Sequence, residues 1–322
     1  MIPSGAPTKR HPTAITRWRA GVVGLLAVAL LTACGGGTSA IDAFKPKRLV
    51  VFGDETSTLT ATGRKYIVNR LDGDDNLDCQ EHPIWVQSLA GIYDFVFAEC
   101  NPDAVAEPQA LMLAVPGARV ADLTAQIDAR LAGAGVADDT LVTVLAGMHD
   151  IIDLYREFPA SDRNTLLTEA RRRGGLAAAQ VNRLVDAGAR VIVSTVPDLG
   201  YTPYARAEAE ANTDTDRSRL IADLTAAFNA GLRTTVTNDG RSIGLALADE
   251  MIQAMVRSPA SFSLGNVSDG ACAIALPDCD ESTMVDNASV TSWLWADDLN
   301  IGFNAHNRLG ILAINRARNN PF

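Results

Sequence analysis

Apolar residues gather in short runs along the chain, and several of these runs end in a turn residue. The runs cover residues 49–52, 111–115, 141–146, 190–196 and 242–247. Runs of this length are typical of strands that are buried on both faces of a sheet, because a half-buried strand would alternate apolar with polar residues. The pattern therefore predicts about five parallel strands.

The stretches between these runs place their apolar residues three or four positions apart. This spacing is typical of amphipathic helices, and it covers residues 83–97, 121–131, 163–187, 220–237 and 249–256. Strands that alternate with helices form βαβ units, and buried parallel strands need helices on both faces. We predict an α/β domain of the flavodoxin-like, three-layer type, without internal repeats.

The first 33 residues have the pattern of an export signal. Basic residues up to Arg19 precede an apolar stretch, residues 20–31, that is too short to span a bilayer. Residues 31–34, Leu-Thr-Ala-Cys, resemble a bacterial lipobox, which would make Cys34 the lipidated first residue of the mature chain. An ordinary signal peptide with an incidental cysteine is the alternative.

These features predict a signal peptide at residues 1–33, a lipidated cysteine with its tether at 34–47, and one domain at 48–322. Gly35 follows the cysteine, which by the sorting habit of such lipoproteins indicates the outer membrane, facing the periplasm or the surface. Loss of residues 1–33, with four basic and no acidic residues, would change the net charge from −10 to −14. An acidic chain repels nucleic acid and anionic lipid surfaces, so we expect no nucleic-acid partner and membrane attachment through the lipid on Cys34.

Four cysteines remain in the predicted domain, and an exported protein meets an oxidising compartment. They form two sequence-local couples, Cys79 with Cys100 and Cys272 with Cys279. Local pairing is the simplest of the three connectivities that four cysteines allow. Zinc is the competing interpretation, but no C-x-x-C motif or histidine cluster accompanies these residues. We therefore expect two disulfides, no metal and no cofactor.

The turn after the first predicted strand, Gly53-Asp54-Glu55, resembles the G-D-S turn of the GDSL, or SGNH, esterases and lipases. In that family the third residue is the serine that attacks the ester. Four further regions match the family's blocks in the same order: residues 114–118, residues 144–150, residues 196–203 with 228–232, and residues 295–306. The resemblance runs from about residue 48 to residue 312 and implies the SGNH hydrolase fold.

The resemblance also implies a role for five positions. Glu55 stands where the family has its nucleophile, and Asn300 stands where it has its histidine base. His149 replaces the asparagine of the oxyanion hole, whereas Gly117 and Asp297 keep the oxyanion glycine and the triad aspartate. An asparagine side chain does not accept and release a proton at neutral pH. We predict a pseudoenzyme of the cell envelope without ordinary serine-esterase activity, with a binding or structural role and a small acyl or glycan ligand.

An active ester hydrolase with a rearranged site is the alternative. Ser57 lies two positions past the nucleophile, where its hydroxyl more simply caps the start of a helix. His306 corresponds to the second histidine of the family's last block, and His82 precedes a proline. We interpret both histidines as packed or locally hydrogen-bonded side chains.

The replaced residues could also form a new site. Glu55, His149 and Asp297 would converge if the fold holds, and two carboxylates with an imidazole suit glycoside hydrolysis or a divalent metal. A simpler hypothesis is that Glu55 and His149 form a charge-assisted pair that fills the former site.

Overall fold

The computed structural model of the protein describes residues 44–237 and 239–319. The predicted signal peptide, Cys34 and most of the predicted tether lie outside these residues, so export and lipid anchoring stay predictions. Within the described ranges, no helix is both long enough and apolar enough to cross a membrane.

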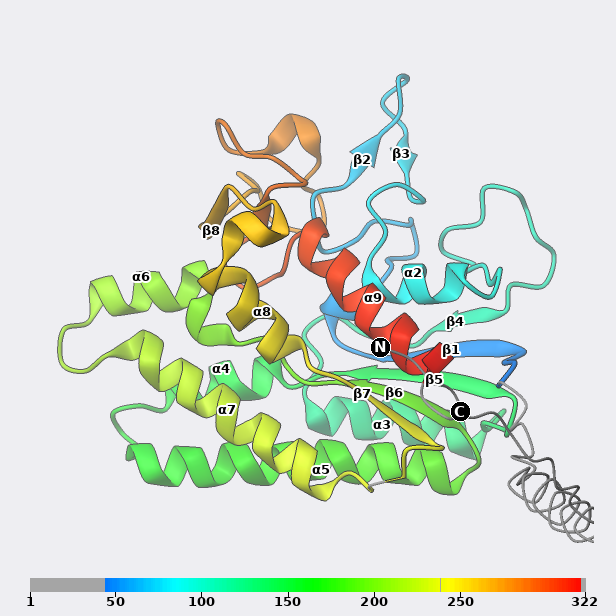
Figure 1. The fold of residues 1–322 in the computed structure, drawn as a ribbon, viewed down its shortest axis with the longest axis horizontal. Coiled ribbons are helices and arrows are strands. Elements are labelled where there is room, and N and C mark those ends of the chain that lie inside the picture. The colour runs from blue at the N-terminus through cyan, green and yellow to red at the C-terminus, as the bar shows by residue number, and fades with distance from the viewer. Residues whose placement is uncertain (1–43, 238, 320–322) are drawn as a thin grey trace, which may run out of the picture. The chain divides into compact units, whose positions relative to one another are not determined.

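Five parallel strands form the central sheet (Figure 1). They are β1 (Arg48–Gly53), β4 (Ala110–Met112), β5 (Thr140–Leu145), β6 (Arg190–Ser194) and β7 (Ile243–Ala246). Their order across the sheet is β4-β1-β5-β6-β7, which is the 2-1-3-4-5 order of flavodoxin-like folds. Each predicted apolar run overlaps one of these strands, so the predicted fold class is confirmed.

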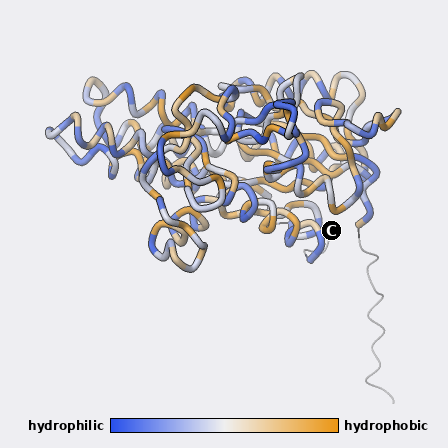
Figure 2. The backbone as a smooth tube through the Cα atoms, turned by 90° about the horizontal axis from the view of Figure 1, so that it is seen from above, coloured by the Kyte–Doolittle hydropathy of each residue, from blue (hydrophilic) through white to orange (hydrophobic). Residues whose placement is uncertain are grey.

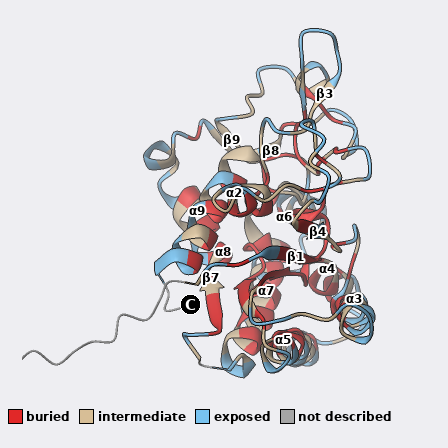
Figure 3. Cartoon of the chain, turned by 90° about the vertical axis from the view of Figure 1, so that its right-hand side faces the viewer, coloured by how far each residue is buried: buried red, intermediate tan, exposed pale blue. Residues whose placement is uncertain are grey.

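Helices cover both faces of this sheet (Figure 1). One face carries α3 (Val120–Ala132), α4 (Met148–Arg156), α5 (Arg163–Asp186) and α7 (Arg217–Thr235), and the other carries α2 (Trp85–Gly91), α8 (Ala248–Arg257) and α9 (Phe303–Asn319). Hydrophobic and hydrophilic stretches alternate along the tube in Figure 2. In Figure 3, strand β1 is buried, whereas α3 and α5 turn an exposed side outward. The helices are therefore amphipathic, as their apolar spacing predicts.

Strand β1 contributes to two hydrophobic cores. Leu49 and Val51 pack on the side of α2 and α9, and Val50 and Phe52 pack on the side of α3 and α5. All four side chains are fully buried, and burial of one such side chain stabilises the fold by about 1.5–3 kcal/mol. The described residues 44–237 and 239–319 belong to one compact unit around these two cores, so this part of the chain is expected to fold on its own.

The predicted helix at residues 83–97 is too long. Helix α2 ends at Gly91, and the chain then turns through Asp94, whose φ of 58° is left-handed. Phe97 is still buried, because it forms a β-bridge to Ala110 at the sheet edge. The apolar spacing of residues 83–97 is therefore that of one long helix, although the turn ends the helix at Gly91. The short helices α4 and α6 (Pro203–Ala211) were not predicted.

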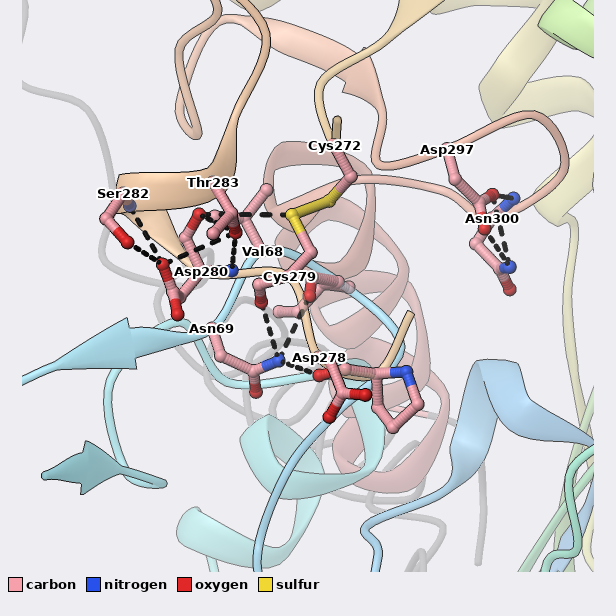
Figure 4. The surroundings of a disulfide bond; sticks show 12 residues. Val68, Asn69, Cys272, Asp278, Cys279, Asp280, Ser282, Thr283, Asp297 and Asn300 are labelled. Atoms are coloured by element: carbon pink, nitrogen blue, oxygen red, sulfur yellow. Dashed lines mark hydrogen bonds between the residues drawn. A yellow bond between two sulfur atoms is a disulfide. The ribbon is translucent and has the colours of Figure 1, made fainter. Parts of the chain in front are cut away.

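Two segments without predicted elements pack against each other beyond the sheet. The first contains β2 (Arg70–Leu71) and β3 (Leu77–Asp78), and the second contains β8 (Asn266–Gly270) and β9 (Trp293–Trp295). The buried Asn69 joins them, because its Nδ2 donates to the carbonyls of Pro277 (2.8 Å) and Cys279 (3.0 Å) (Figure 4). The side-chain amide thus adds to the isolated backbone bridge between Asn69 and Asp280.

Both predicted disulfides are present. Cys79–Cys100 joins the end of β3 to the segment before β4, and Cys272–Cys279 closes the loop that Asn69 contacts (Figure 4). The two bonds therefore restrain the parts of the domain that have the least regular secondary structure.

The longest helices, α5 and α7, approach each other through glycines. A Cβ atom on Gly231 would lie 2.0 Å from the carbonyl oxygen of Arg171, and one on Gly174 would lie 1.9 Å from that of Phe228. Neither distance is compatible with a side chain, so the helices would have to separate to admit one.

Gly231→Ala should therefore lower the free energy of unfolding of residues 43–322. We expect a loss of about 2 kcal/mol, because overpacking of a core costs about 1–3 kcal/mol. Urea denaturation measures this loss. Gly91→Ala is the matched control, since its Cβ would meet open space, and it should change the stability by less than about 0.5 kcal/mol. Equal effects of the two variants would contradict close packing of α5 and α7.

Candidate functional site

The candidate site lies at the carboxyl edge of the sheet, where the turn after β1 places Glu55. Asp54 caps the short 3-10 helix η1 (Glu55–Ser57) by accepting a hydrogen bond from the backbone N–H of Thr56. Glu55 is the first residue of η1 and is only 7% exposed. Its carboxylate therefore cannot be satisfied by bulk water alone and needs protein donors.

Each oxygen of the Glu55 carboxylate has its own partner. Oε1 lies 2.7 Å from Nε2 of His149, and Oε2 accepts a hydrogen bond of 2.8 Å from the backbone N–H of Gly117. Gly117 and His149 are the two positions that the resemblance assigns to the oxyanion hole. The side chain of Glu55 thus occupies the donors that would otherwise stabilise a developing oxyanion.

The contacts make Glu55 and His149 an ion pair. Burial alone would raise the pKa of Glu55, but the hydrogen bonds from His149 and Gly117 hold the pKa below its ordinary value of 4.5. The hydrogen bond to Glu55 raises the pKa of His149 above 6.5, although burial opposes this change. The contacts therefore favour the charged form of both side chains, which agrees with the hypothesis of a charge-assisted plug.

Helix α4 holds the parts of this cluster together. It begins directly after β5 and carries His149 in its first turn. The next residue, Asp150, is buried, and its Oδ2 accepts a hydrogen bond of 2.8 Å from the backbone N–H of Val120 at the start of α3. Asp153 binds Nε of Arg119 at 2.6 Å. One helix therefore presents His149 and also fixes the loop that presents Gly117.

Asp54 is a buried acid that the sequence analysis did not single out. Its side chain is fully buried, and its Oδ2 has no hydrogen-bond partner among the described residues. Burial, and then the charge of Glu55, raise the pKa of Asp54 to about 7. Neither the capping role of Asp54 nor its burial was predicted from the sequence.

Asp297 and Asn300 form a second, separate pair. The backbone N–H of Asn300 donates to Oδ1 of Asp297 at 2.7 Å, and Nδ2 of Asn300 lies 3.2 and 3.1 Å from the two carboxylate oxygens (Figure 4). Asn300 thus makes the contact that the family's histidine would make, without a group that transfers protons. Among the described residues, no hydrogen bond or ion pair connects these two residues to Glu55 or His149.

Ser57 is not a helix cap, which corrects the interpretation from the sequence. Asp54 caps η1, and the fully buried hydroxyl of Ser57 instead accepts a hydrogen bond of 3.2 Å from Nε1 of Trp85. The buried His306 accepts a bond of 3.4 Å at Nδ1 from the backbone N–H of Trp85, and burial lowers its pKa to about 3. His82 is also engaged locally, with Nδ1 3.2 Å from the carbonyl of Val68.

The described residues contain no group of three or more histidine, cysteine, aspartate or glutamate side chains that could hold a metal ion. Glu55 and His149 come together, but Asp297 is bound to Asn300 rather than to them. The geometry therefore gives no support to a metal site built from these three residues.

Three matched segments meet at one edge of the sheet. Glu55 follows β1, Gly117 follows β4 and His149 follows β5, and these strands are adjacent in the order β4-β1-β5. The strand order is that of flavodoxin-like folds. It brings Glu55, Gly117 and His149 together, whereas Asn300 contacts Asp297.

The chain has low-identity likenesses among solved structures. No protein-family model and no curated protein matches the chain. Among solved structures, the chain is similar to a member of the lipolytic protein G-D-S-L family from Veillonella parvula (9% identity, TM-score 0.40, 83% of this chain and 96% of that one). It is also similar to the acetylxylan esterase Axe2 from Geobacillus stearothermophilus (11%, 0.43, 84% and 94%) and to the acetyl xylan esterase AlAXEase (10%, 0.41, 82% and 96%). These likenesses concern the fold alone.

The Glu55–His149 pair should stabilise the protein within a defined pH range. The raised pKa of His149 makes its contribution complete below pH 6.5 and lost as the pH rises through the folded-state pKa. The lowered pKa of Glu55 makes its contribution complete above pH 4.5 and lost as the pH falls through the folded-state pKa. A double-mutant cycle with Glu55→Gln and His149→Gln should give a coupling energy of about 1–2 kcal/mol near pH 5.5, since the pair is partly exposed.

The same cycle repeated at pH 9 provides the control. Deprotonation of His149 removes the ionic part of the interaction, so the coupling energy at pH 9 should be lower than at pH 5.5 by about 0.5 kcal/mol or more. A coupling energy that does not change between pH 5.5 and pH 9 would show that the pair is not ionic.

Asp54 should have the opposite effect on stability. Its pKa is raised from 3.8 to about 7, so its contribution is complete below pH 3.8 and is lost as the pH rises through about 7. Asp54→Asn removes the charge and keeps an oxygen for the N–H of Thr56. The stability of this variant relative to the parent should therefore increase by about 1 kcal/mol or more from pH 4 to pH 8, measured by urea denaturation. A constant difference would mean that the carboxylate is not destabilised by burial.

Proposed function

We propose that the protein is a non-hydrolytic member of the SGNH hydrolase family that is anchored in the bacterial envelope through Cys34 and has a binding or structural role. The observation that carries this proposal is the position of the Glu55 carboxylate on the N–H of Gly117 and on His149. The lipobox-like residues 31–34 support the anchor, and the acidic composition supports attachment through a lipid rather than through surface charge.

Ester hydrolysis needs three connected parts: a nucleophile, a base that takes its proton, and donors for the oxyanion. In this chain the backbone N–H of Gly117 and the ring of His149 bind Glu55. The side chain that is hydrogen-bonded to Asp297 is that of Asn300, which cannot act as a base. Ser57 is fully buried and bonded to Trp85, so its hydroxyl is not a substitute nucleophile. The geometry therefore disfavours the alternative of a rearranged esterase.

A carboxylate-based glycosidase is disfavoured for an electrostatic reason. Such an enzyme needs one carboxylic acid with a raised pKa that can protonate the leaving group. The pKa of Glu55 is lowered instead, because His149 and Gly117 bind its ionised form. Burial raises the pKa of Asp54 and of Asp150 near this site, but Asp54 is fully buried and Asp150 is buried against the backbone N–H of Val120.

The proposal predicts that residues 43–322 do not hydrolyse p-nitrophenyl acetate or butyrate faster than buffer does. The triple variant Glu55→Ser, His149→Asn and Asn300→His should hydrolyse the acetate at least about tenfold faster than the parent, because it restores nucleophile, donor and base. General acid–base catalysis alone contributes about 10²–10⁴-fold in enzymes. Release of p-nitrophenol measures both reactions.

Two controls make this experiment specific. Asp297→Ala in the triple variant should remove most of the gained activity, since the restored histidine would lose its orienting carboxylate. Parent activity well above buffer that disappears in Ser57→Ala would contradict the proposal and favour the active hydrolase.

A further inference from the structure

A pocket lies at the amino-terminal edge of the sheet, at the opposite end of the strands from Glu55. It has a volume of about 360 Å³, and it is formed by the start of β1, the segment before β4 and the end of α3. Its polar lining consists of Lys47, Arg48, Glu107, Gln109 and Arg130. None of these residues takes part in the site described above.

The charges of this pocket are not balanced. Lys47 is paired with Asp139 at 3.1 Å. Arg48 and Arg130 form no ion pair with any described residue, and Nε of Arg130 is buried without a hydrogen-bond partner among those residues. Burial, and then the charge of Arg48, lower the pKa of Arg130. Two guanidinium groups therefore line the pocket with one carboxylate, that of Glu107, and neither guanidinium forms an ion pair with a described residue.

An apolar groove adjoins this pocket and shares Leu111 and Arg130 with it. The groove has a volume of about 340 Å³, and Leu113, Ala129 and Ala134 complete its apolar lining. It lies beside β4, the edge strand of the sheet, and Leu111 on this strand is 38% exposed. A cationic pocket thus continues directly into an apolar groove.

We propose that the pocket and the groove together bind a single-chain aliphatic carboxylate, with its head at Arg48 and Arg130 and its chain along Leu111 and Leu113. Each volume falls within the range of about 300–1,000 Å³ that is typical of small-molecule sites. The planar guanidinium group matches a carboxylate through two parallel hydrogen bonds. An apolar chain beside the head then covers the exposed part of the edge strand.

The charge of the pocket selects this ligand over two others. Arg48 and Arg130 together with Glu107 give a net charge of one positive unit, because Lys47 is already neutralised by Asp139. This charge suits a carboxylate monoanion better than a phosphate dianion. The net charge of −10 of the whole chain opposes docking on an anionic membrane surface. A single bound carboxylate interacts mainly with the charged side chains of the pocket, because salt screens the more distant charges. The assignment is independent of the state of Glu55.

Calorimetric titration of residues 43–322 with sodium laurate, below its micelle concentration, tests the proposal. We expect one bound laurate per chain, no detectable binding of acetate, and binding of dodecyl maltoside at least about tenfold weaker than that of laurate. The double variant Arg48→Gln and Arg130→Gln should bind laurate at least about tenfold more weakly, since a hydrogen bond to a charged group contributes about 1.5–3 kcal/mol.

The matched control is Arg171→Gln with Arg206→Gln, which removes the same charge from exposed positions on α5 and α6 and should leave the affinity unchanged. Circular dichroism checks that each variant is folded. If the double variant unfolds, the single variants Arg48→Gln and Leu111→Glu replace it in the titration. Both side chains are exposed, so these changes should leave the fold intact, and each variant should bind laurate more weakly than the parent.

Three results would overturn the proposal. The first is equal laurate affinity of the parent and the folded Arg48 and Arg130 variants. The second is tighter binding of dodecyl phosphate than of laurate, which would assign the pocket to a phosphate. The third is sedimentation with phosphatidylglycerol vesicles in the absence of laurate binding, which would make this edge a membrane-docking surface.

Discussion

The Glu55 carboxylate is the group on which the arrangement of the carboxyl edge depends. It connects the ends of three neighbouring strands. Glu55 follows β1, and its two partners, Gly117 and His149, follow the adjacent strands β4 and β5. A buried carboxylate is costly unless both oxygens are bound. Here each oxygen has a donor at 2.7 or 2.8 Å. The buried carboxylate is therefore accommodated by donors that the neighbouring strands supply at this place.

The substitutions form two closed pairs, whereas a hydrolase needs one connected series. In an esterase, a carboxylate orients an imidazole, the imidazole contacts the nucleophile, and the oxyanion donors stay free for the substrate. In this protein Glu55 binds the N–H of Gly117 and the ring of His149. The carboxylate of Asp297 binds Asn300. A neutral asparagine at position 149 would leave the charge of Glu55 without a cationic partner, so Glu55 and His149 are physically a unit.

The fold followed from the sequence further than the site did. Apolar runs predicted all five strands of the sheet, because burial on both faces leaves a continuous apolar pattern. The contact between Glu55 and His149 followed from adjacent strands and opposite charge. The burial of Asp54 and the bond from Trp85 to Ser57 did not follow, since they depend on α2 packing beside η1. Asn69 was missed because its contacts bridge segments more than 200 residues apart.

The two ends of the sheet differ in how their polar groups are satisfied. Open α/β sheets usually bind ligands at the carboxyl ends of their strands, but here the protein's own side chains hold the donors at that end. Asp54 and Asn300 keep an unpartnered oxygen there. Asp54 can lose its charge by protonation and Asn300 has none, so neither requires a ligand. Arg130 at the amino end keeps its charge at any physiological pH and has an unpartnered Nε. Because buried polar groups are nearly always satisfied, an anion bound at the amino end would supply the partner that Nε of Arg130 lacks among the described residues.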